Sequence, residues 1–112
     1  MIDFEFVRQF ALSLEGVVEL PHFEKASFRV KGKIFLTLDV PNHRVCVKLS
    51  EMDQSLFSAF DKSVVYPIPN KWGKMGYTFV ELKSVPLETL QDLITTSYQT
   101  VLTPKKKPNK ER

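Results

Sequence analysis

The chain has 112 residues and a mass of 12.9 kDa, enough for one domain with one hydrophobic core, which excludes a multidomain enzyme. Apolar residues make up 43% and charged residues 26%, as in ordinary globular proteins, so a disordered or fibrous chain is excluded. The formal net charge of +3 suggests a nucleic-acid partner, but residues 104–112 hold five basic residues and one acidic residue, which leaves residues 1–103 at −1.

Two features of the sequence bear on location. No run approaches the roughly 18 apolar residues of a transmembrane helix, and Asp3 lies where a secretion signal would carry basic residues. Cys46 is the only cysteine, which excludes an internal disulfide and a cysteine-rich metal site and fits a reducing compartment. We therefore expect a cytoplasmic monomer that has no membrane partner.

The N-terminal half predicts one helix and then three strands. Apolar residues recur at helical spacing after Asp3, a suitable N-cap, and Gly16 follows as a stop signal; they are Phe4, Val7, Phe10, Ala11 and Leu14. From residue 28 the pattern changes to alternation, which indicates strands. The alternating residues are Phe28 and Val30, then Ile34, Leu36, Leu38 and Val40, then Val45, Val47 and Leu49.

Two short loops set the expected register of these strands. A three-residue loop at 31–33, with Gly32 in the middle, pairs Val30 with Ile34 and Phe28 with Leu36. A four-residue loop at 41–44 pairs Val40 with Val45 and Leu38 with Val47. Both hairpins place the aliphatic residues on one face of the sheet.

The C-terminal half predicts a helix, two strands and a last helix. Ser50 is the expected N-cap of the middle helix, which should turn its large apolar residues inward: Met52, Leu56, Phe57 and Phe60. A short strand at 64–66 and a strand at 77–82 flank a loop at 67–76 that is rich in Pro and Gly. The last helix starts near Pro86 and ends before Pro104.

The element order α-β-β-β-α-β-β-α predicts an α+β fold, a two-layer sandwich in which helices cover one face of an antiparallel sheet. We expect a single domain over residues 1–103 and a basic, disordered tail over 104–112. The predicted helices are acidic and the sheet is basic. The open face of the sheet should show Arg29, Phe35, Thr37, Cys46, Lys48, Tyr77, Phe79 and Glu81.

The residues that usually carry catalysis form no recognisable pattern. His22 and His43 have no other metal ligand at suitable spacing. Cys46 lies in the middle of a predicted strand, where a small structural residue is the simpler interpretation. The four glycines are scattered and form no phosphate-binding loop. We expect a protein that is not an enzyme and has no cofactor.

Two basic loop tips are the clearest candidate binding features. Lys31 and Lys33 flank the first hairpin turn, and Lys71 and Lys74 flank Trp72 in the long loop. Such tips reach phosphates in β-ribbon DNA readers, although exposed turns often carry lysine without any partner. Trp72 either stacks on a base or partner surface or covers the core. The basic tail is either a solvated terminus or a non-specific nucleic-acid contact.

Several spaced motifs resemble the MmcQ/YjbR family of small bacterial proteins over residues 3–103. They are PHFE (21–24), FRVKGKIF (28–35), VCVKL (45–49), the stretch from Pro67 that includes WGKMGYTFV (72–80), and SYQTV (97–101). The resemblance implies an α-β(3)-α-β(2)-α fold of the kind seen in secretion chaperones. It also implies DNA binding through likeness to a double-wing module, which is an argument from fold. Tyr77 departs from the family pattern, which has Trp there.

Two hypotheses about function follow. In the first, the chain is a DNA-binding module, and Trp72 and Phe35 add apolar or stacking contacts to cations that contact phosphates. Those cations are Arg29, Lys31, Lys33, Lys48, Lys71 and Lys74. In the alternative, the same face is a protein-interaction surface on which Phe35, Tyr77 and Phe79 bury against a protein or peptide. Enzyme or small-molecule chemistry is a distant third.

Overall fold

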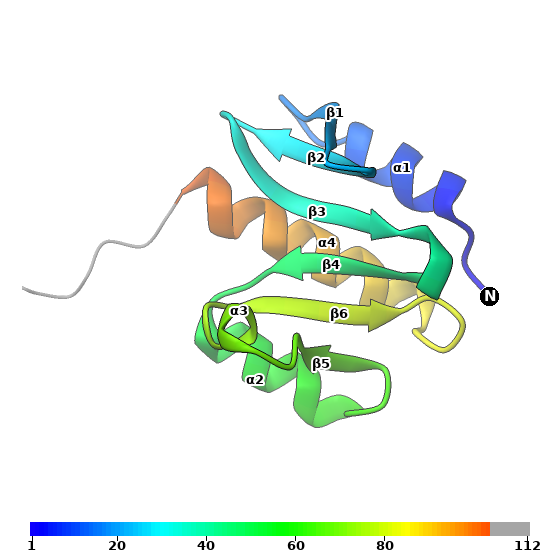
Figure 1. Cartoon of the computed structure of the whole chain (residues 1–112), viewed down its shortest axis with the longest axis vertical. Coiled ribbons are helices and arrows are strands. Elements are labelled where there is room, and N and C mark those ends of the chain that lie inside the picture. Colours follow the sequence, from blue (N-terminus) through cyan, green and yellow to red (C-terminus); the bar gives the residue numbers. More distant parts are fainter. Residues whose placement is uncertain (104–112) are drawn as a thin grey trace, which may run out of the picture.

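A computed structural model describes residues 1–103; the tail at 104–112, for which we expect disorder, lies outside the described residues. Six antiparallel strands form one sheet in the order β1-β2-β3-β4-β6-β5 (Figure 1). Along the chain the elements are α1 (Phe4–Leu12), β1 (Val18–His22), β2 (Lys25–Val30), β3 (Lys33–Asp39), the 3-10 helix η1 (Val40–Asn42), β4 (Arg44–Lys48), α2 (Glu51–Phe60), β5 (Val65–Pro67), α3 (Lys71–Lys74), β6 (Tyr77–Glu81) and α4 (Leu87–Leu102).

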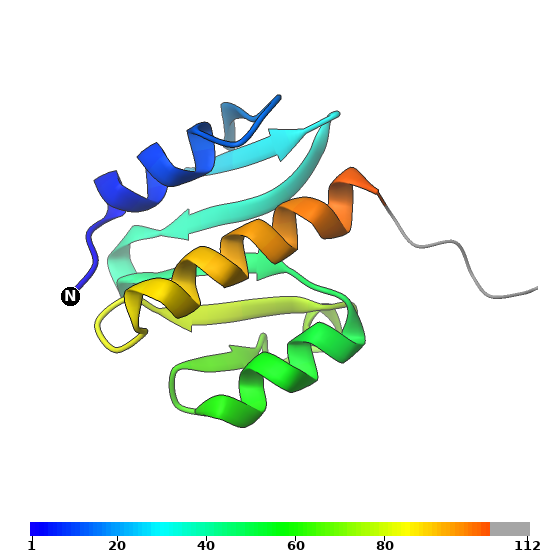
Figure 2. The same cartoon turned by 180° about the vertical axis from the view of Figure 1, so that it is seen from behind.

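The helices α1, α2 and α4 lie on one side of the sheet, and the other side is open except for α3 at one end (Figures 1 and 2). The predicted α+β two-layer fold is thus confirmed. Three elements were not predicted: the edge strand β1, the 3-10 helix η1 and the single turn α3. β1 has no buried residue and contains Pro21, which an edge strand accommodates because one side of its backbone has no ladder partner.

Helix starts follow the predicted caps. The Asp3 carboxylate accepts a hydrogen bond from the Phe6 amide at 2.9 Å, and the Ser50 hydroxyl accepts one from the Asp53 amide at 3.1 Å. These bonds satisfy amide groups that have no partner within the first helical turn. Between the helices and the sheet lies one core, to which strands and helices contribute, including Phe28, Leu36, Val47, Val80, Leu90 and Ile94.

The β2–β3 hairpin departs from the expected register by one residue. Its turn has two residues, Lys31 and Gly32, with φ angles of 53° and 79°, so Val30 pairs with Lys33 and not with Ile34. A bulge then restores the predicted pairing of Phe28 with Leu36. The sequence prediction missed the bulge because it counted the extra residue as part of the loop.

The bulge decides where Phe35 lies. It is the unpaired residue of β3, and it points into the core, where its ring packs edge-on against Tyr98 of α4 with centroids 5.7 Å apart. Phe35 is 1% exposed, so the prediction that it lies on the open face is wrong. Ile34 takes its place on that face, opposite Arg29.

The β3–β4 hairpin also shifts, but without changing faces. Val45 pairs with Leu38 and not with Val40, because Val40 belongs to η1. The shift is two residues, and a strand has a side-chain period of two, so the predicted aliphatic residues remain on the core face. Thr37 and Cys46 lie on the open face, as expected, and the shifted register pairs them with each other.

Helix α2 faces the opposite way from the prediction. Met52, Leu56 and Phe60 are 67%, 65% and 73% exposed, and Phe57 is only half-buried. The buried residue of α2 is Gln54. The expectation that the large apolar residues of this helix turn inward is wrong for these three, because α2 packs at the edge of the sheet, beside β5, where no further element covers its outer side (Figure 2).

Candidate functional site

One end of the open sheet face is occupied by internal charge pairing. The register places Asp39 opposite Arg44 and Arg44 opposite Glu81. Arg44 Nε donates to Asp39 Oδ2 at 2.8 Å, and Lys25 Nζ lies 3.8 Å from Asp39 Oδ1. The Tyr66 hydroxyl accepts a hydrogen bond from Arg44 at 3.3 Å and donates one to Glu81. We call Lys25, Asp39, Arg44, Tyr66 and Glu81 the paired end.

The paired end covers its apolar neighbours. The Arg44 guanidinium lies 3.6 Å from the centroid of the Phe79 ring, and Tyr66 packs against the same ring. Burial alone would raise the pKa of the Asp39 carboxyl, but hydrogen bonds from Arg44 and Asn42 outweigh burial and lower the pKa. Phe79 thus lies on the open face, as predicted, but Arg44 and Tyr66 cover its ring.

Cys46 lies beneath this cover, and burial raises the pKa of its thiol to about 11. Because the thiolate is the reactive form, we expect native Cys46 to react with a disulfide reagent at pH 7.5 on the order of 100-fold more slowly than an ordinary thiol with a pKa of about 8.5. The rate should rise as the pH approaches 11. Absorbance of the released thiolate measures it, with the urea-unfolded chain as control. Equal rates in the folded and unfolded chain would contradict the structural role of Cys46.

The other end of the open face carries the predicted binding residues. The β2–β3 turn, the last residue of β4 and helix α3 all lie at this end of the sheet (Figure 1). We call the set the basic end: Arg29, Lys31, Lys33, Lys48, Lys71, Trp72 and Lys74. Lys33 pairs with the buried Val30 and Arg29 with Ile34, so these two cations leave the sheet on opposite sides of the hairpin.

The cations of the basic end form no ion pair within residues 1–103, although Glu51 lines the same hollow as Lys71 and Lys74. Residues 1–103 contain four ion pairs, which use Arg8, Lys25 and Arg44 as their cations. None includes a lysine or arginine of the basic end. Their hydrogen bonds go to neutral groups: Arg29 donates to Ser27 and to the Pro21 carbonyl, and Lys48 donates to the Met75 carbonyl. The cations at this end are therefore not held in ion pairs within residues 1–103, unlike those of the paired end.

An apolar groove of about 520 Å³ lies beside these cations. We call it the aromatic groove, and it is lined by His22, Phe23, Ile34, Thr37, Ile68, Trp72 and Tyr77. The β1–β2 turn supplies one wall, where Phe23 is 91% exposed, and α3 supplies Trp72, which is 49% exposed. An exposed aromatic wall beside cations is a surface to which a planar, anionic ligand is complementary.

Trp72 is held in place by Tyr77 and flanked by lysines. The two rings pack edge-on with centroids 5.7 Å apart. Lys71 Nζ lies 5.9 Å from the Trp72 centroid, and Lys48 Nζ lies 5.2 Å from the Tyr77 centroid. Burial lowers the pKa of the Lys48 ammonium. Trp72 is thus neither a cover of the core nor fully exposed. Its ring contacts Tyr77, and about half of its surface faces solvent.

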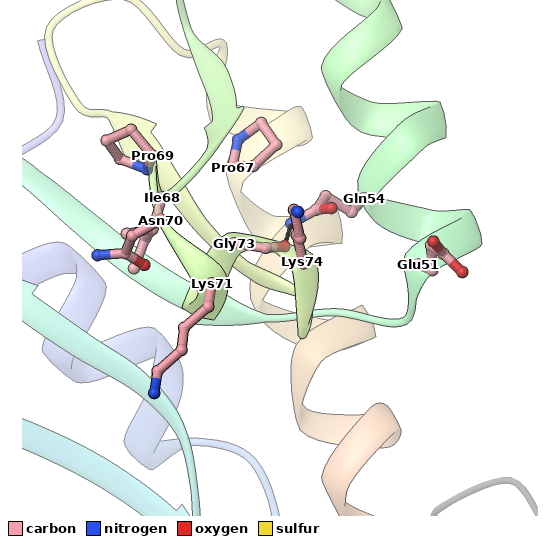
Figure 3. A pocket seen from close by; sticks show the side chains of 9 residues that line it. All are labelled: Glu51, Gln54, Pro67, Ile68, Pro69, Asn70, Lys71, Gly73 and Lys74. Atoms are coloured by element: carbon pink, nitrogen blue, oxygen red, sulfur yellow. Dashed lines mark hydrogen bonds between the residues drawn. The ribbon is translucent and has the colours of Figure 1, made fainter.

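The buried amide of Gln54 positions α3. Its Nε2 donates to the Gly73 carbonyl at 2.9 Å and to the Thr78 hydroxyl at 3.0 Å, which connects α2 to both α3 and β6. The same residues form part of a second hollow, drawn in Figure 3. There Lys74 extends alongside Gln54, whereas Lys71 extends away from it (Figure 3). The two lysines predicted as one tip therefore point in different directions.

Sequence reasoning missed part of this site. His22, Phe23, Ile34 and Ile68 line the aromatic groove but were not among the predicted binding residues. Phe23 gave a usable signal, because it is a large aromatic residue between predicted elements. Ile34 gave no such signal, because the bulge decides on which face of the sheet its side chain lies. Among the described residues no group of three or more His, Cys, Asp or Glu could hold a metal ion, and no helix has the length and hydrophobicity to cross a membrane.

Comparison with known proteins identifies the family of this fold. The family model YjbR matches residues 12–100. This chain belongs to the YjbR family. The crystal structure of the Deinococcus radiodurans protein DR2400, described by the family model DUF419, resembles the YjbR chain with a TM-score of 0.77 and 22% sequence identity. The match covers 96% of this chain and 81% of that one, and it shows a shared fold. No curated protein matches the YjbR chain in sequence.

Proposed function

We propose that this YjbR-family chain is a DNA-binding module that contacts the phosphate backbone through its basic end. The observation that carries the proposal is the contrast between the two ends of the open face. Lys25 and Arg44 pair with Asp39, whereas the cations at the other end form no ion pair within residues 1–103. A cluster of cations that are not held in ion pairs attracts a polyanion, and binding gains free energy from the release of counterions.

The aromatic groove supports a preference for unpaired nucleotides. Bases in a duplex are stacked on each other and cannot lie against Trp72, whereas bases in a single strand can. Two of the groove's rings have a lysine beside them, Lys71 by Trp72 and Lys48 by Tyr77, so a strand whose phosphates contact these lysines can bring a base against Trp72. Lys48, which donates to the Met75 carbonyl, adds positive charge beside the Tyr77 ring that lines the groove. Single-stranded DNA is therefore the ligand that this geometry fits best.

A titration tests the proposal. Labelled single-stranded and duplex DNA of mixed sequence and equal length are titrated at low and moderate salt with the intact chain and with a chain that ends at Thr103. We expect both chains to bind, the single strand more tightly, and we expect the affinity to fall steeply with salt. Loss of all binding on removal of the tail would assign the binding to residues 104–112 and contradict the proposal.

Trp72 offers a direct probe, because it is the only tryptophan in the chain. We expect its fluorescence to be quenched when single-stranded DNA binds. Trp72→Ala should weaken that binding by about 1–3 kcal/mol, the usual contribution of one base stacked on an aromatic side chain, whereas Trp72→Phe should retain most of the affinity. Unchanged fluorescence at saturating DNA would show that the strand does not pass over this residue.

The alternative function is peptide binding in the same aromatic groove. The exposure of Phe23 favours it, because a wall of this kind also fits an apolar side chain of a partner. Phe35 no longer belongs to this hypothesis, because it lies in the core, and Phe79 is covered by Arg44. Salt separates the two functions, since affinity for a mainly apolar partner changes little with ionic strength.

A further inference from the structure

Helix α2 carries a row of exposed apolar side chains on the helix side of the domain, away from the basic end. Met52, Leu56 and Phe60 follow each other at intervals of four residues, and each is about two thirds or more exposed. Residues at this spacing form one ridge along a helix. We call them the outer stripe. Single exposed apolar residues are ordinary, but a contiguous row of large ones marks an interaction surface.

A groove of about 350 Å³ runs beside the outer stripe, between α2 and α4. Leu56, Phe57 and Phe60 supply its apolar side. Thr89, Asp92 and Thr96 of α4 line the opposite side, and Asp53 of α2 completes it. The groove is thus a channel between two helices with an apolar wall and a polar wall.

The charges in this groove are all negative. Asp53 and Asp92 are the only ionisable residues that line it, one from each helix. Neither takes part in the four ion pairs of residues 1–103. An apolar wall that faces two carboxylates without cations is complementary to a segment that combines large apolar side chains with lysine or arginine.

We propose that the groove between α2 and α4 binds a basic amphipathic helix of another protein, whose apolar ridge packs against the outer stripe and whose cations pair with Asp53 and Asp92. A helix suits this site because helices pack by setting the ridge of one between the ridges of another. The site lies on the opposite layer from the basic end, so it does not depend on the proposed DNA binding (Figure 2).

Two other occupants fit the surface less well. A second copy of this chain would bring two further carboxylates against Asp53 and Asp92 and no cation that the groove itself supplies. The tail at 104–112 is basic, but prolines are its only apolar residues, so it offers nothing large enough to cover Leu56 and Phe60.

The test uses two synthetic helical peptides of about 14 residues, each with leucines spaced to form one ridge. The remaining positions are lysine in one peptide and glutamate in the other. We expect the intact chain to bind the lysine peptide at least about tenfold more tightly than the glutamate peptide. The double variant Leu56→Ser/Phe60→Ser should weaken binding of the lysine peptide at least about tenfold. Equal binding by that variant, or no binding by the intact chain, would overturn the proposal.

Matched variants separate the contributions of the carboxylates and of the apolar residues to peptide binding. Asp53→Asn/Asp92→Asn should weaken binding of the lysine peptide and flatten its salt dependence. The control Val18→Ser/Leu20→Ser replaces two exposed apolar residues of β1 and should leave binding unchanged. Circular dichroism and cooperative unfolding in denaturant confirm that each variant is folded. Two results would overturn the proposal. If the chain dimerises and Leu56→Ser/Phe60→Ser abolishes the dimer, the groove binds a second copy. If removal of the tail tightens peptide binding at least about tenfold, the groove binds the tail.

Discussion

Replacing Lys31 and Lys33 by alanine, or Lys71 and Lys74, is expected to weaken binding to single-stranded DNA by about tenfold at roughly 0.1 M salt, and replacing all four by on the order of 100-fold. The reason is the release of counterions from each neutralised phosphate. A single-strand contact contributes about −0.7 to the slope of log affinity against log salt. Each pair should therefore reduce the slope by about 1.4, and the combination by about 2.8. Fluorescence anisotropy over a series of salt concentrations measures both quantities.

A control variant with the same change in charge tests whether DNA affinity depends on the position of the lysines or only on the net charge of the chain. Lys62 and Lys83 are also exposed, but they lie in loops after α2 and after β6, away from the basic end. Lys62→Ala/Lys83→Ala should leave both slope and affinity nearly unchanged at moderate salt, because the loops after α2 and β6 lie at the other end of the sheet from the β2–β3 turn (Figure 1), and salt screens exposed charges that are far apart. If this control weakens binding as much as the tip pairs do, binding depends on net charge alone.

Gly76→Ala should cause a large loss of stability, a fall of about 3 kcal/mol or more in the free energy of unfolding. Gly76 has a φ of +102°, and an added Cβ would lie 1.9 Å from the Leu49 carbonyl oxygen. The backbone cannot easily retreat, because the Leu49 amide donates to the Gly76 carbonyl at 2.9 Å. Denaturant unfolding followed by circular dichroism measures the loss, which corresponds to a decrease in Tm of more than about 10 °C.

Gly32→Ala is the matched control for backbone strain. Gly32 also has a positive φ, of +79°, but an added Cβ would meet no atom within 4 Å. Its substitution should cost only about 1 kcal/mol, the penalty of the left-handed conformation. If the two variants were equally stable, the close approach of Gly76 to Leu49 would not constrain the chain. A larger loss at Gly76 would show that this contact holds α3, and with it Trp72, next to the sheet.

The two proposed binding sites lie on opposite sides of the sheet. The aromatic groove and the basic end, except for Lys33, belong to the open side of the sheet, and the groove beside the outer stripe belongs to the helix side. The two ligands should therefore bind together without competition. Saturating the chain with DNA should leave its affinity for the lysine peptide unchanged once direct contact between peptide and DNA is prevented by adequate salt.

Local signals in the sequence predicted the elements well. Asp3 and Ser50 mark helix starts because their side chains bond to backbone groups only three residues away. Alternation predicted β2, β3, β4 and β6 because the two faces of each strand meet different surroundings. The same motifs indicated the YjbR family, and the family model agrees. All these signals depend on residues close together in the chain.

Features that depend on contacts between distant segments escaped prediction. Phe35 moved into the core because a bulge, set by the pairing of β2 with β3, inserted one residue into the strand. The aromatic groove joins the β1–β2 turn to α3, segments some fifty residues apart, which no local pattern relates. The predicted cations did gather at one end of the sheet, but their lack of acidic partners became visible only when Asp39 was seen to pair with Lys25 and Arg44.

The sequence by itself determined where the three long helices and the strands β2, β3, β4 and β6 lie, and it indicated the family, because each of these depends on neighbours along the chain. The tertiary structure alone decided which apolar residues are covered. Met52, Leu56 and Phe60 have the spacing of a buried face, yet burial requires a second element opposite that face. Helix α2 lies at the edge of its layer, so within residues 1–103 no such element exists and the face remains exposed.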